Sequence, residues 1–161
     1  MHQFNENPES LDKASIFRRL AAAGYDALLC LALLMTTTGL YMLIANAIIG
    51  SEKYKVMTEA GKTLHDPLLS SILFIVLYSF FAYFWTKNGQ TLGMQAWHLR
   101  IQNSNNTSIS LTQALLRFLM AAVSAACFGL GYLWMLIDKK DRTWQCMFSD
   151  TQVVRMPKRK D

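Results

Sequence analysis

Long apolar runs separated by short charged loops constrain this chain more than any other feature of its sequence. Two runs are long enough to cross a membrane, at about residues 20–49 and 68–86, and a third apolar segment covers residues 111–137. A soluble core alternates apolar and polar positions instead, because its helices and strands keep one face in water. The pattern therefore predicts an all-α, multi-pass membrane protein with one membrane domain.

The first two segments differ in how well they match the thickness of a bilayer. The 30 residues from 20 to 49 measure about 45 Å as a helix, whereas the hydrocarbon core is about 30 Å thick. The first segment is therefore expected to tilt or to extend into the interface. The second segment is shorter, and it ends in an aromatic cluster, Tyr83, Phe84 and Trp85, that suits a membrane–water interface.

The third segment differs from the first two because two glycines interrupt it. It opens with a capping box formed by Ser110 and Gln113, and Gly129 and Gly131 follow near its end. Small residues permit a tight bend between two helical pieces inside a membrane protein. Two alternatives follow: a broken or re-entrant helix hinged at the glycines, or a third simple crossing.

Basic residues constrain which side of the membrane each part of the chain occupies. The region after the third segment carries seven of them: Lys139, Lys140, Arg142, Arg155, Lys158, Arg159 and Lys160. Three simple crossings would place either this region or the N-terminus, which carries Lys13, Arg18 and Arg19, outside, against the positive-inside rule. We therefore favour the re-entrant alternative, with both termini in the cytoplasm and the chain in a bacterial plasma (inner) membrane.

The regions outside the apolar segments complete the expected organisation. Residues 1–15 are polar and are expected to form a cytoplasmic N-terminus, residues 16–154 the membrane domain, and residues 155–161 a basic tail. Beside a membrane, such a tail is attracted to anionic lipid headgroups.

The loop between the second and third segments contains a short amphipathic stretch followed by turn-forming residues. Residues 92–96 predict a short helix on the cytoplasmic membrane surface. Trp97–Gln102 and Thr107–Ser110 then predict the two strands of a β-hairpin, with its turn at Asn103–Asn106.

Asp26 is the main candidate for a functional residue, because an ionised carboxylate near the hydrocarbon needs a partner. Arg18 and Arg19 lie near the same face of the first helix, and Arg117 enters the membrane from the same inferred side. An Asp26–Arg117 pair would clamp the first segment to the third without any further role. Alternatively, Arg19, Asp26 and Arg117 would form part of a ligand or ion site, or the carboxylate would be exposed.

Several classes of function lack the residues that they require. One membrane aspartate cannot form an aspartyl dyad, and no GxSxG or HExxH motif occurs. The three cysteines, Cys30, Cys127 and Cys146, have no metal-ligand spacing, and basic charge is divided among short loops. We expect no enzyme, no catalytic residue, no cofactor, no metal and no nucleic-acid partner. Membrane lipids are expected partners, and a second copy or another membrane protein is an open alternative.

Four short motifs occur in order along the chain. They read RRLAAAGYD, GQTLGM, ALLR and Gly-x-Gly, and their main positions are Arg19, Asp26, Gly89, Thr91, Gly93, Arg117, Gly129 and Gly131. Together they resemble the RDD family of small bacterial membrane proteins, which is named for one arginine and two aspartates. The resemblance covers roughly residues 17–154 and implies that Arg19 and Asp26 are the family's arginine and first aspartate.

The end of the chain departs from the family pattern. The family closes with a histidine–aspartate pair and then with glycine, threonine and two valines, whereas this sequence reads TWQCMFSDTQVV. Aligned on Thr151 and the valines after it, the second aspartate falls at Cys146 and the glycine at Asp150. Either Asp150 substitutes from one turn away, or the second aspartate is lost. Asp138 is another candidate acidic partner.

The resemblance implies a membrane role without a defined chemistry. Transport of unidentified ligands has been proposed for the family, with cation–proton exchange for some members. One hypothesis is therefore a transport component for ions or small solutes, in which Asp26 is the protonatable site. The alternative is a non-transporting membrane adaptor or assembly factor, in which the polar cluster is structural.

Overall fold

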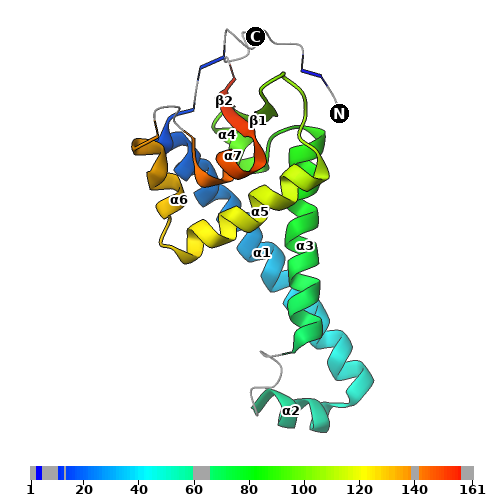
Figure 1. Ribbon diagram of the computed structural model, residues 1–161. Coiled ribbons are helices and arrows are strands. Elements are labelled where there is room, and N and C mark those ends of the chain that lie inside the picture. Colours follow the sequence, from blue (N-terminus) through cyan, green and yellow to red (C-terminus); the bar gives the residue numbers. More distant parts are fainter. Residues whose placement is uncertain (1–2, 5–10, 13, 60–65, 139–141, 157–161) are drawn as a thin grey trace. The chain divides into compact units, whose positions relative to one another are not determined.

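The structure is a computed structural model, which describes residues 3–4, 11–12, 14–59, 66–138 and 142–156. Two of its helices are long and apolar enough to span a membrane, α1 (Ile16–Ile49) and α3 (Pro67–Lys87) (Figure 1). Both expected spans are confirmed. At about 1.5 Å per residue, the 34 residues of α1 measure about 51 Å, so this helix exceeds the hydrocarbon core by even more than expected.

The described chain divides into two compact units, Ala27–Ser79 and the remainder. The smaller unit contains the second part of α1, the short helix α2 (Ser51–Glu59) and the start of α3. Gly50 separates α1 from α2 with a left-handed φ of 89°, a backbone conformation that glycine adopts without steric cost. Asp66 then caps α3, because its Oδ1 accepts a 2.9 Å hydrogen bond from the backbone N–H of Leu68.

The larger unit combines short helices with one antiparallel pair of strands. Its elements are α4 (Leu92–Ala96), β1 (Leu99–Asn103), α5 (Leu111–Ala126), α6 (Leu130–Leu133), η2 (Trp134–Leu136), α7 (Trp144–Ser149) and β2 (Thr151–Arg155). The short helix expected at residues 92–96 is confirmed as α4.

The expected antiparallel strand pair is present, but the prediction of its second strand was wrong. β1 pairs with β2, in a register that places Ile101 opposite Val153, rather than with Thr107–Ser110. A backbone hydrogen bond from Asn103 to Thr107 closes the turn after β1, and Ser110 is used as the N-cap of α5. Apolar, β-branched residues of β2 therefore take the place beside β1.

The described part of the N-terminal region packs on the same strand pair. The backbone N–H of Ala14 donates to the carbonyl of Val153 at 3.3 Å, and that of Arg155 donates to Asp12 at 2.8 Å. Gln3 forms an isolated bridge with Thr107. The start of α1 and the C-terminal strand are thus held together. Most of the expected basic tail, residues 157–161, lies outside the described residues, as do residues 1–2, 5–10 and 13 of the N-terminal segment.

The third apolar segment is a bent pair of helices, as the interrupting glycines predicted. Its two pieces, Leu111–Ala126 and Leu130–Leu136, meet at an angle of 106°. The bend falls slightly before the expected hinge, because Phe128 and Gly129 both adopt left-handed backbone conformations. Gly131 instead lies inside α6, where an added Cβ would approach Oγ of Ser124 to 2.5 Å.

The chain returns from the bend to the strand pair. α7 packs against α5, and the side chain of Gln113, at the start of α5, donates to the backbone carbonyl of Ser149 at 3.0 Å. β2 follows α7 and pairs with β1, which itself follows α3. Both ends of the third segment are therefore attached to the same small sheet.

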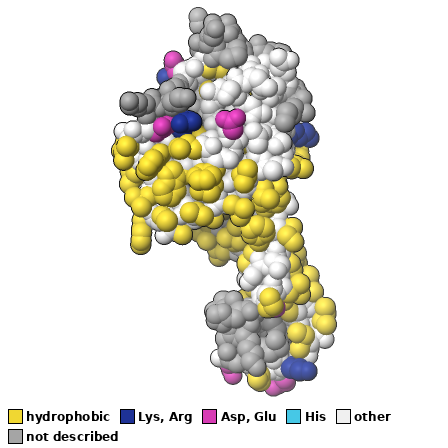
Figure 2. Space-filling view, in the orientation of Figure 1, with side chains coloured by type: hydrophobic (Ala, Val, Ile, Leu, Met, Phe, Trp, Pro, Cys, Tyr) yellow, Lys and Arg dark blue, Asp and Glu magenta, His cyan; other side chains and the backbone are white. Residues whose placement is uncertain are grey.

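Apolar side chains gather over α5 and α6 on the surface of the larger unit (Figure 2). The exposed apolar residues of this region are Leu111, Leu116, Leu119, Val123, Phe128, Leu130, Leu133, Trp134, Leu136 and Ile137. Because these elements belong to a chain with two membrane-spanning helices, their exposed apolar side chains suit contact with lipid rather than water.

Candidate functional site

Arg19, Asp26 and Arg117 are all buried in the larger unit, with exposed fractions of 7%, 7% and 6%. The expected clamp between Asp26 and Arg117 is not formed, because neither arginine pairs with this carboxylate in the part of the chain that the structure describes. The three residues instead belong to two neighbouring sets of contacts, one around Asp26 and one around Cys146. We refer to the two sets together as the polar centre.

The first set attaches α4 to α1. One carboxylate oxygen of Asp26 accepts a hydrogen bond from the hydroxyl of Thr91, and the other accepts one of 2.9 Å from the backbone N–H of Gly93. Thr91 is also the N-cap of α4, since its hydroxyl oxygen accepts from the backbone N–H of Met94 at 3.2 Å. A carboxylate at the start of a helix binds free N–H groups and the positive end of the helix dipole. Asp26 therefore acts as an external cap for α4.

The glycines of GQTLGM have identifiable roles in this contact. A Cβ on Gly93 would lie 2.8 Å from Oδ1 of Asp26 and would also collide with the carbonyl of Ala22. Gly89 has a left-handed φ of 67°, and a Cβ there would lie 2.6 Å from the carbonyl of Ile101. Both positions thus need glycine because another backbone approaches closely.

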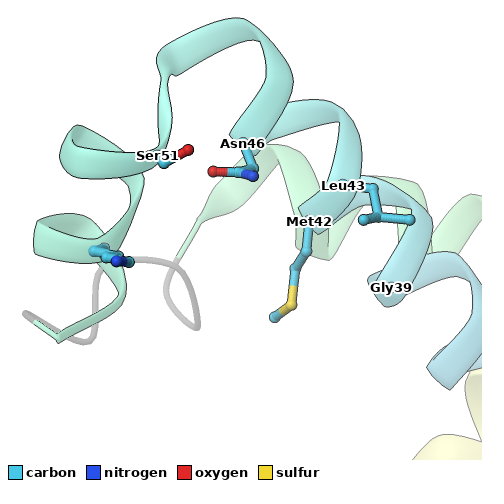
Figure 3. Close-up of a pocket in the computed structure, with 6 residues that line it drawn as sticks. Gly39, Met42, Leu43, Asn46 and Ser51 are labelled. Atoms are coloured by element: carbon cyan, nitrogen blue, oxygen red, sulfur yellow. The ribbon is translucent and has the colours of Figure 1, made fainter.

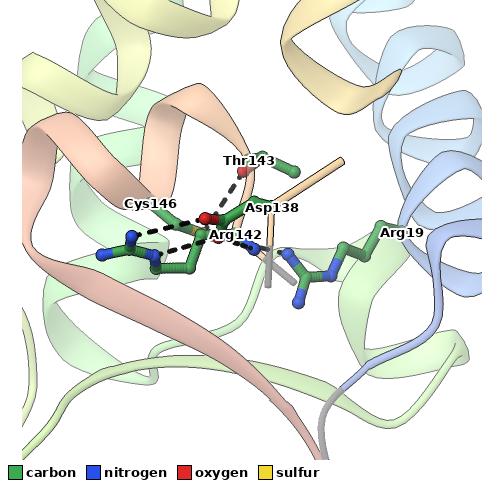
Figure 4. Close-up of polar contacts among 5 residues, drawn as sticks. All are labelled: Arg19, Asp138, Arg142, Thr143 and Cys146. Atoms are coloured by element: carbon green, nitrogen blue, oxygen red, sulfur yellow. Dashed lines mark hydrogen bonds and ion pairs between the residues drawn. The ribbon is translucent and has the colours of Figure 1, made fainter. Parts of the chain in front are cut away.

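The second set brings both arginines to one sulfur atom. Nη1 of Arg19 lies 3.9 Å from Sγ of Cys146, and Nη1 of Arg117 lies 3.6 Å from it. The hydroxyl of Thr143 donates to the same sulfur at 3.3 Å (Figure 4). Cys146 is 2% exposed, so these contacts lie in a largely water-free environment.

Each arginine is also anchored away from the sulfur. Arg19 donates from Nε to the carbonyl of Ala14 at 3.0 Å and from Nη2 to that of Val153 at 3.4 Å. Arg117 donates to the hydroxyl of Thr151 at 2.5 Å, and its guanidinium lies 5.6 Å from the ring centre of Trp85. The arginines therefore connect α1 and α5 to the sheet as well as to α7.

Within the second set, the surrounding charges change the pKa of the Cys146 thiol. Burial alone would raise the pKa of its thiol, but Arg117, Arg19 and the hydrogen bonds from Thr143 and Arg117 together lower the pKa below its ordinary value. The thiol thus stands where two guanidinium groups converge, and its environment favours the charged form.

The two other candidate aspartates lie elsewhere. Asp150 is exposed and ends α7 with a left-handed φ of 49°, the conformation for which glycine is the usual residue. It therefore does not take the place of a carboxylate at Cys146. The carboxylate of Asp138 is bound by Arg142 at 3.1 Å, a pair formed within one chain segment.

Sequence reasoning missed some of the polar residues around this centre. Thr143 stands at the N-cap position of α7, three residues before Cys146, a spacing that could have identified it. Ser124 and Gln145 are also buried, and their side-chain polar atoms have no hydrogen-bond partner among the described residues. Nothing in their local sequence distinguishes them from ordinary helix residues.

The smaller unit contains an open pocket of about 700 Å³ (Figure 3). It is lined by Gly39, Met42, Leu43, Asn46, Ser51 and Lys55. The side chains of Asn46 and Ser51 point toward each other across its end, and Met42 supplies an apolar wall. Within the described ranges no group of three or more histidine, cysteine, aspartate or glutamate side chains could hold a metal ion. His65, the neighbour of Asp66, lies outside those ranges.

Comparison with known proteins gives one match. The model of the RDD family matches residues 13–150, which is most of the chain and includes the contacts described above for Asp26 and for the sulfur of Cys146. No curated protein and no solved structure matches the sequence. The match spans both long helices, the bent pair and the polar centre, and this chain is therefore an RDD-family membrane protein.

Proposed function

We propose that this protein is a non-transporting, non-catalytic membrane adaptor or assembly factor, whose polar centre fixes a small folded unit to a membrane helix. The observation that carries the proposal is how the carboxylate of Asp26 is bound. Both of its carboxylate oxygens are occupied by groups at the start of α4. A cation or a proton that binds this carboxylate would compete with these bonds, and buried polar groups that lose their partners are costly.

In this proposal, the part of the chain that Asp26 holds is a platform at the membrane surface. It consists of α4, the strand pair and α7, and the N-terminal segment adds hydrogen bonds to β2. In this proposal the platform contacts a partner, either another membrane protein or a second copy of this chain, and lipid surrounds the apolar helices. No nucleic-acid partner, cofactor or metal is proposed.

The same proposal includes a location. Lysine and arginine residues occur at both ends of the chain, three of them in residues 1–19 and seven in residues 139–161, and the described parts of these ends meet at the strand pair. The positive-inside rule then favours a cytoplasmic platform and a multi-pass position in a bacterial plasma membrane. Labelling of single cysteines introduced at exposed Gln95 and Ile48 from either side of sealed vesicles tests this orientation.

A transport component is the second candidate, and the burial of Asp26 favours it. A carboxylate that is 7% exposed on a membrane-spanning helix is a protonatable group of the kind that marks ion paths. In this reading proton binding at Asp26 would release Thr91 and Gly93 and move α4.

Proton flux in proteoliposomes separates the two candidates. Wild type, Asp26→Asn and the exposed control Asp150→Asn are reconstituted at matched density under sodium, potassium and lithium gradients. The adaptor proposal expects no flux in any of them and a lower unfolding midpoint for Asp26→Asn alone. Flux that persists in Asp150→Asn and disappears in a folded Asp26→Asn protein would instead establish transport.

Crosslinking in the native membrane tests whether the platform binds a specific partner. A photoreactive residue at exposed Gln95, on the platform, is expected to give one discrete adduct, either a dimer of this chain or a complex with one membrane protein. The matched position is Ile48, which is 79% exposed on α1. Adducts of equal yield and pattern at both positions would argue against a platform-specific partner.

A further inference from the structure

We propose that Cys146 is a thiolate in the folded protein and that it serves as the resident anion between Arg19 and Arg117. The inference goes beyond the proposed function, because it holds whether the chain transports or not. It assigns a charge and a role to a residue that composition alone would class as a small hydrophobic side chain.

The geometry around the sulfur is that of an anion site. Three donors converge on Sγ, at 3.9 Å from Arg19, 3.6 Å from Arg117 and 3.3 Å from Thr143. A neutral thiol is only a weak acceptor, whereas a thiolate accepts strongly from guanidinium and hydroxyl groups. A small hydrophobic side chain does not require three polar neighbours that point at it.

Charge balance favours the same assignment. Arg19 and Arg117 bring two positive charges into a buried region, and Asp26 brings one negative charge. Tyr132 lies within electrostatic reach of all three and of Cys146, so the four groups share one region. A neutral thiol would leave a net charge of +1 away from water, and an uncompensated buried charge is strongly destabilising. A thiolate makes the sum zero.

The other described groups near the sulfur do not change this balance. The groups that face the centre are Arg19 and Asp26 from α1, Arg117 from α5, Tyr132 from α6 and Thr143 at the start of α7. Arg142 also lies within electrostatic reach of Cys146, but it is paired with Asp138, so the two together add no net charge. Among these described groups, Asp26 already accepts hydrogen bonds from α4, and it forms no ion pair with either arginine. Among the described groups, Cys146 is therefore the one left to compensate the positive charges of Arg19 and Arg117.

Infrared spectroscopy tests the charge directly. In a protein that carries Cys30→Ser and Cys127→Ser, Cys146 is the one remaining cysteine, so any S–H stretching band belongs to it. We expect no S–H band in the folded protein at neutral pH and its appearance on acidification. A full-intensity S–H band at neutral pH would overturn the assignment.

Substitution gives an independent readout that a merely structural cysteine would not produce. With a thiolate, Cys146→Asp keeps the unfolding midpoint near that of wild type, whereas neutral Cys146→Ser lowers it by about 5 °C or more. With a neutral thiol, Cys146→Ser instead keeps the midpoint near that of wild type, because serine nearly matches the size of cysteine and is also neutral. Cys127→Ser, at a half-buried position, is the control and should leave the midpoint unchanged. If Cys146→Ser does not fold, the infrared measurement still decides.

Discussion

The backbone N–H of Gly93 donates a 2.9 Å hydrogen bond to Oδ1 of Asp26, so a carboxylate on the first membrane helix holds the first turn of α4. Thr91 binds the other oxygen, and the same hydroxyl caps α4. Two residues that are 67 positions apart in sequence thereby join the membrane helix to the loop that follows the second span. This connection explains why an aspartate is retained beside the hydrocarbon: it satisfies the start of a neighbouring helix.

Gly93→Ala should break this connection. The added Cβ would lie 2.8 Å from Oδ1 of Asp26 and would collide with the carbonyl of Ala22, so either α4 or α1 must shift. We expect a loss of about 1–3 kcal/mol in the free energy of unfolding, measured by denaturation in detergent. Gly24→Ala is the matched control, because a Cβ there meets nothing within 4 Å and the helix should tolerate or favour it. Equal effects of the two substitutions would contradict this account.

Two substitutions at Thr91 distinguish the contribution of its hydroxyl group from that of its side-chain shape. Thr91→Val removes the hydrogen bond to Asp26 and the cap of Met94, and the site is 1% exposed, so water cannot replace them. We expect a loss of about 1–3 kcal/mol in the free energy of unfolding. Thr91→Ser retains the hydroxyl and should recover most of this loss. A serine variant as unstable as the valine variant would assign the effect to the missing methyl group.

Arg117→Lys should lose stability although it retains the charge. The guanidinium contacts Cys146 and Thr151 from Nη1 and lies over the ring of Trp85, and a single ammonium group cannot reproduce this planar arrangement. We expect a loss of about 1–3 kcal/mol in the free energy of unfolding, measured in detergent. Arg155→Lys, at an exposed position at the end of β2, is the control. Equal stability of wild type and Arg117→Lys would show that charge alone suffices.

Asp150→Gly should stabilise the protein. Asp150 has a φ of 49°, in a left-handed conformation that costs a non-glycine residue about 1–2 kcal/mol, and its side chain is exposed. Part of this cost is offset by the larger backbone entropy of glycine in the unfolded chain. We therefore expect a small gain in the unfolding midpoint for Asp150→Gly and a loss for Asp150→Ala. A lower midpoint for the glycine variant would indicate a role of the carboxylate.

Features encoded locally could be predicted from the sequence, and contacts between distant segments could not. The capping box at Ser110 and the bend near Gly129 depend on neighbouring residues, and both are found. The strand opposite β1 lies some 50 residues further on, at Thr151–Arg155, and the nearer residues 107–110 offered an equally reasonable partner before the turn geometry was known. Likewise, charge alone suggested an Asp26–Arg117 pair. The arginine instead faces α7, and this choice depends on how α5 and α7 pack.

The stability of the folded protein should depend on pH through Cys146. Its pKa is lowered in the folded state, so the unfolded chain binds more protons between the folded value and the unfolded value of about 8.5. The contribution of Cys146 to stability is therefore complete above the unfolded pKa and is lost as the pH falls through the folded pKa. The difference in unfolding free energy between wild type and Cys146→Ser should grow as the pH rises to about 8.5 and then level off.

In the difference between wild type and Cys146→Ser, the contributions of the other titrating groups to the pH dependence cancel, because both proteins contain these groups. Cys127→Ser serves as the control pair, since it changes the same residue type and no pKa shift for Cys146 depends on it. Its difference from wild type measures the effect of the same cysteine-to-serine change away from the two arginines over the same pH range. A flat profile for Cys146→Ser would mean that the thiol has the same pKa in the folded and unfolded chain, and the two arginines would then stabilise no charge at the sulfur.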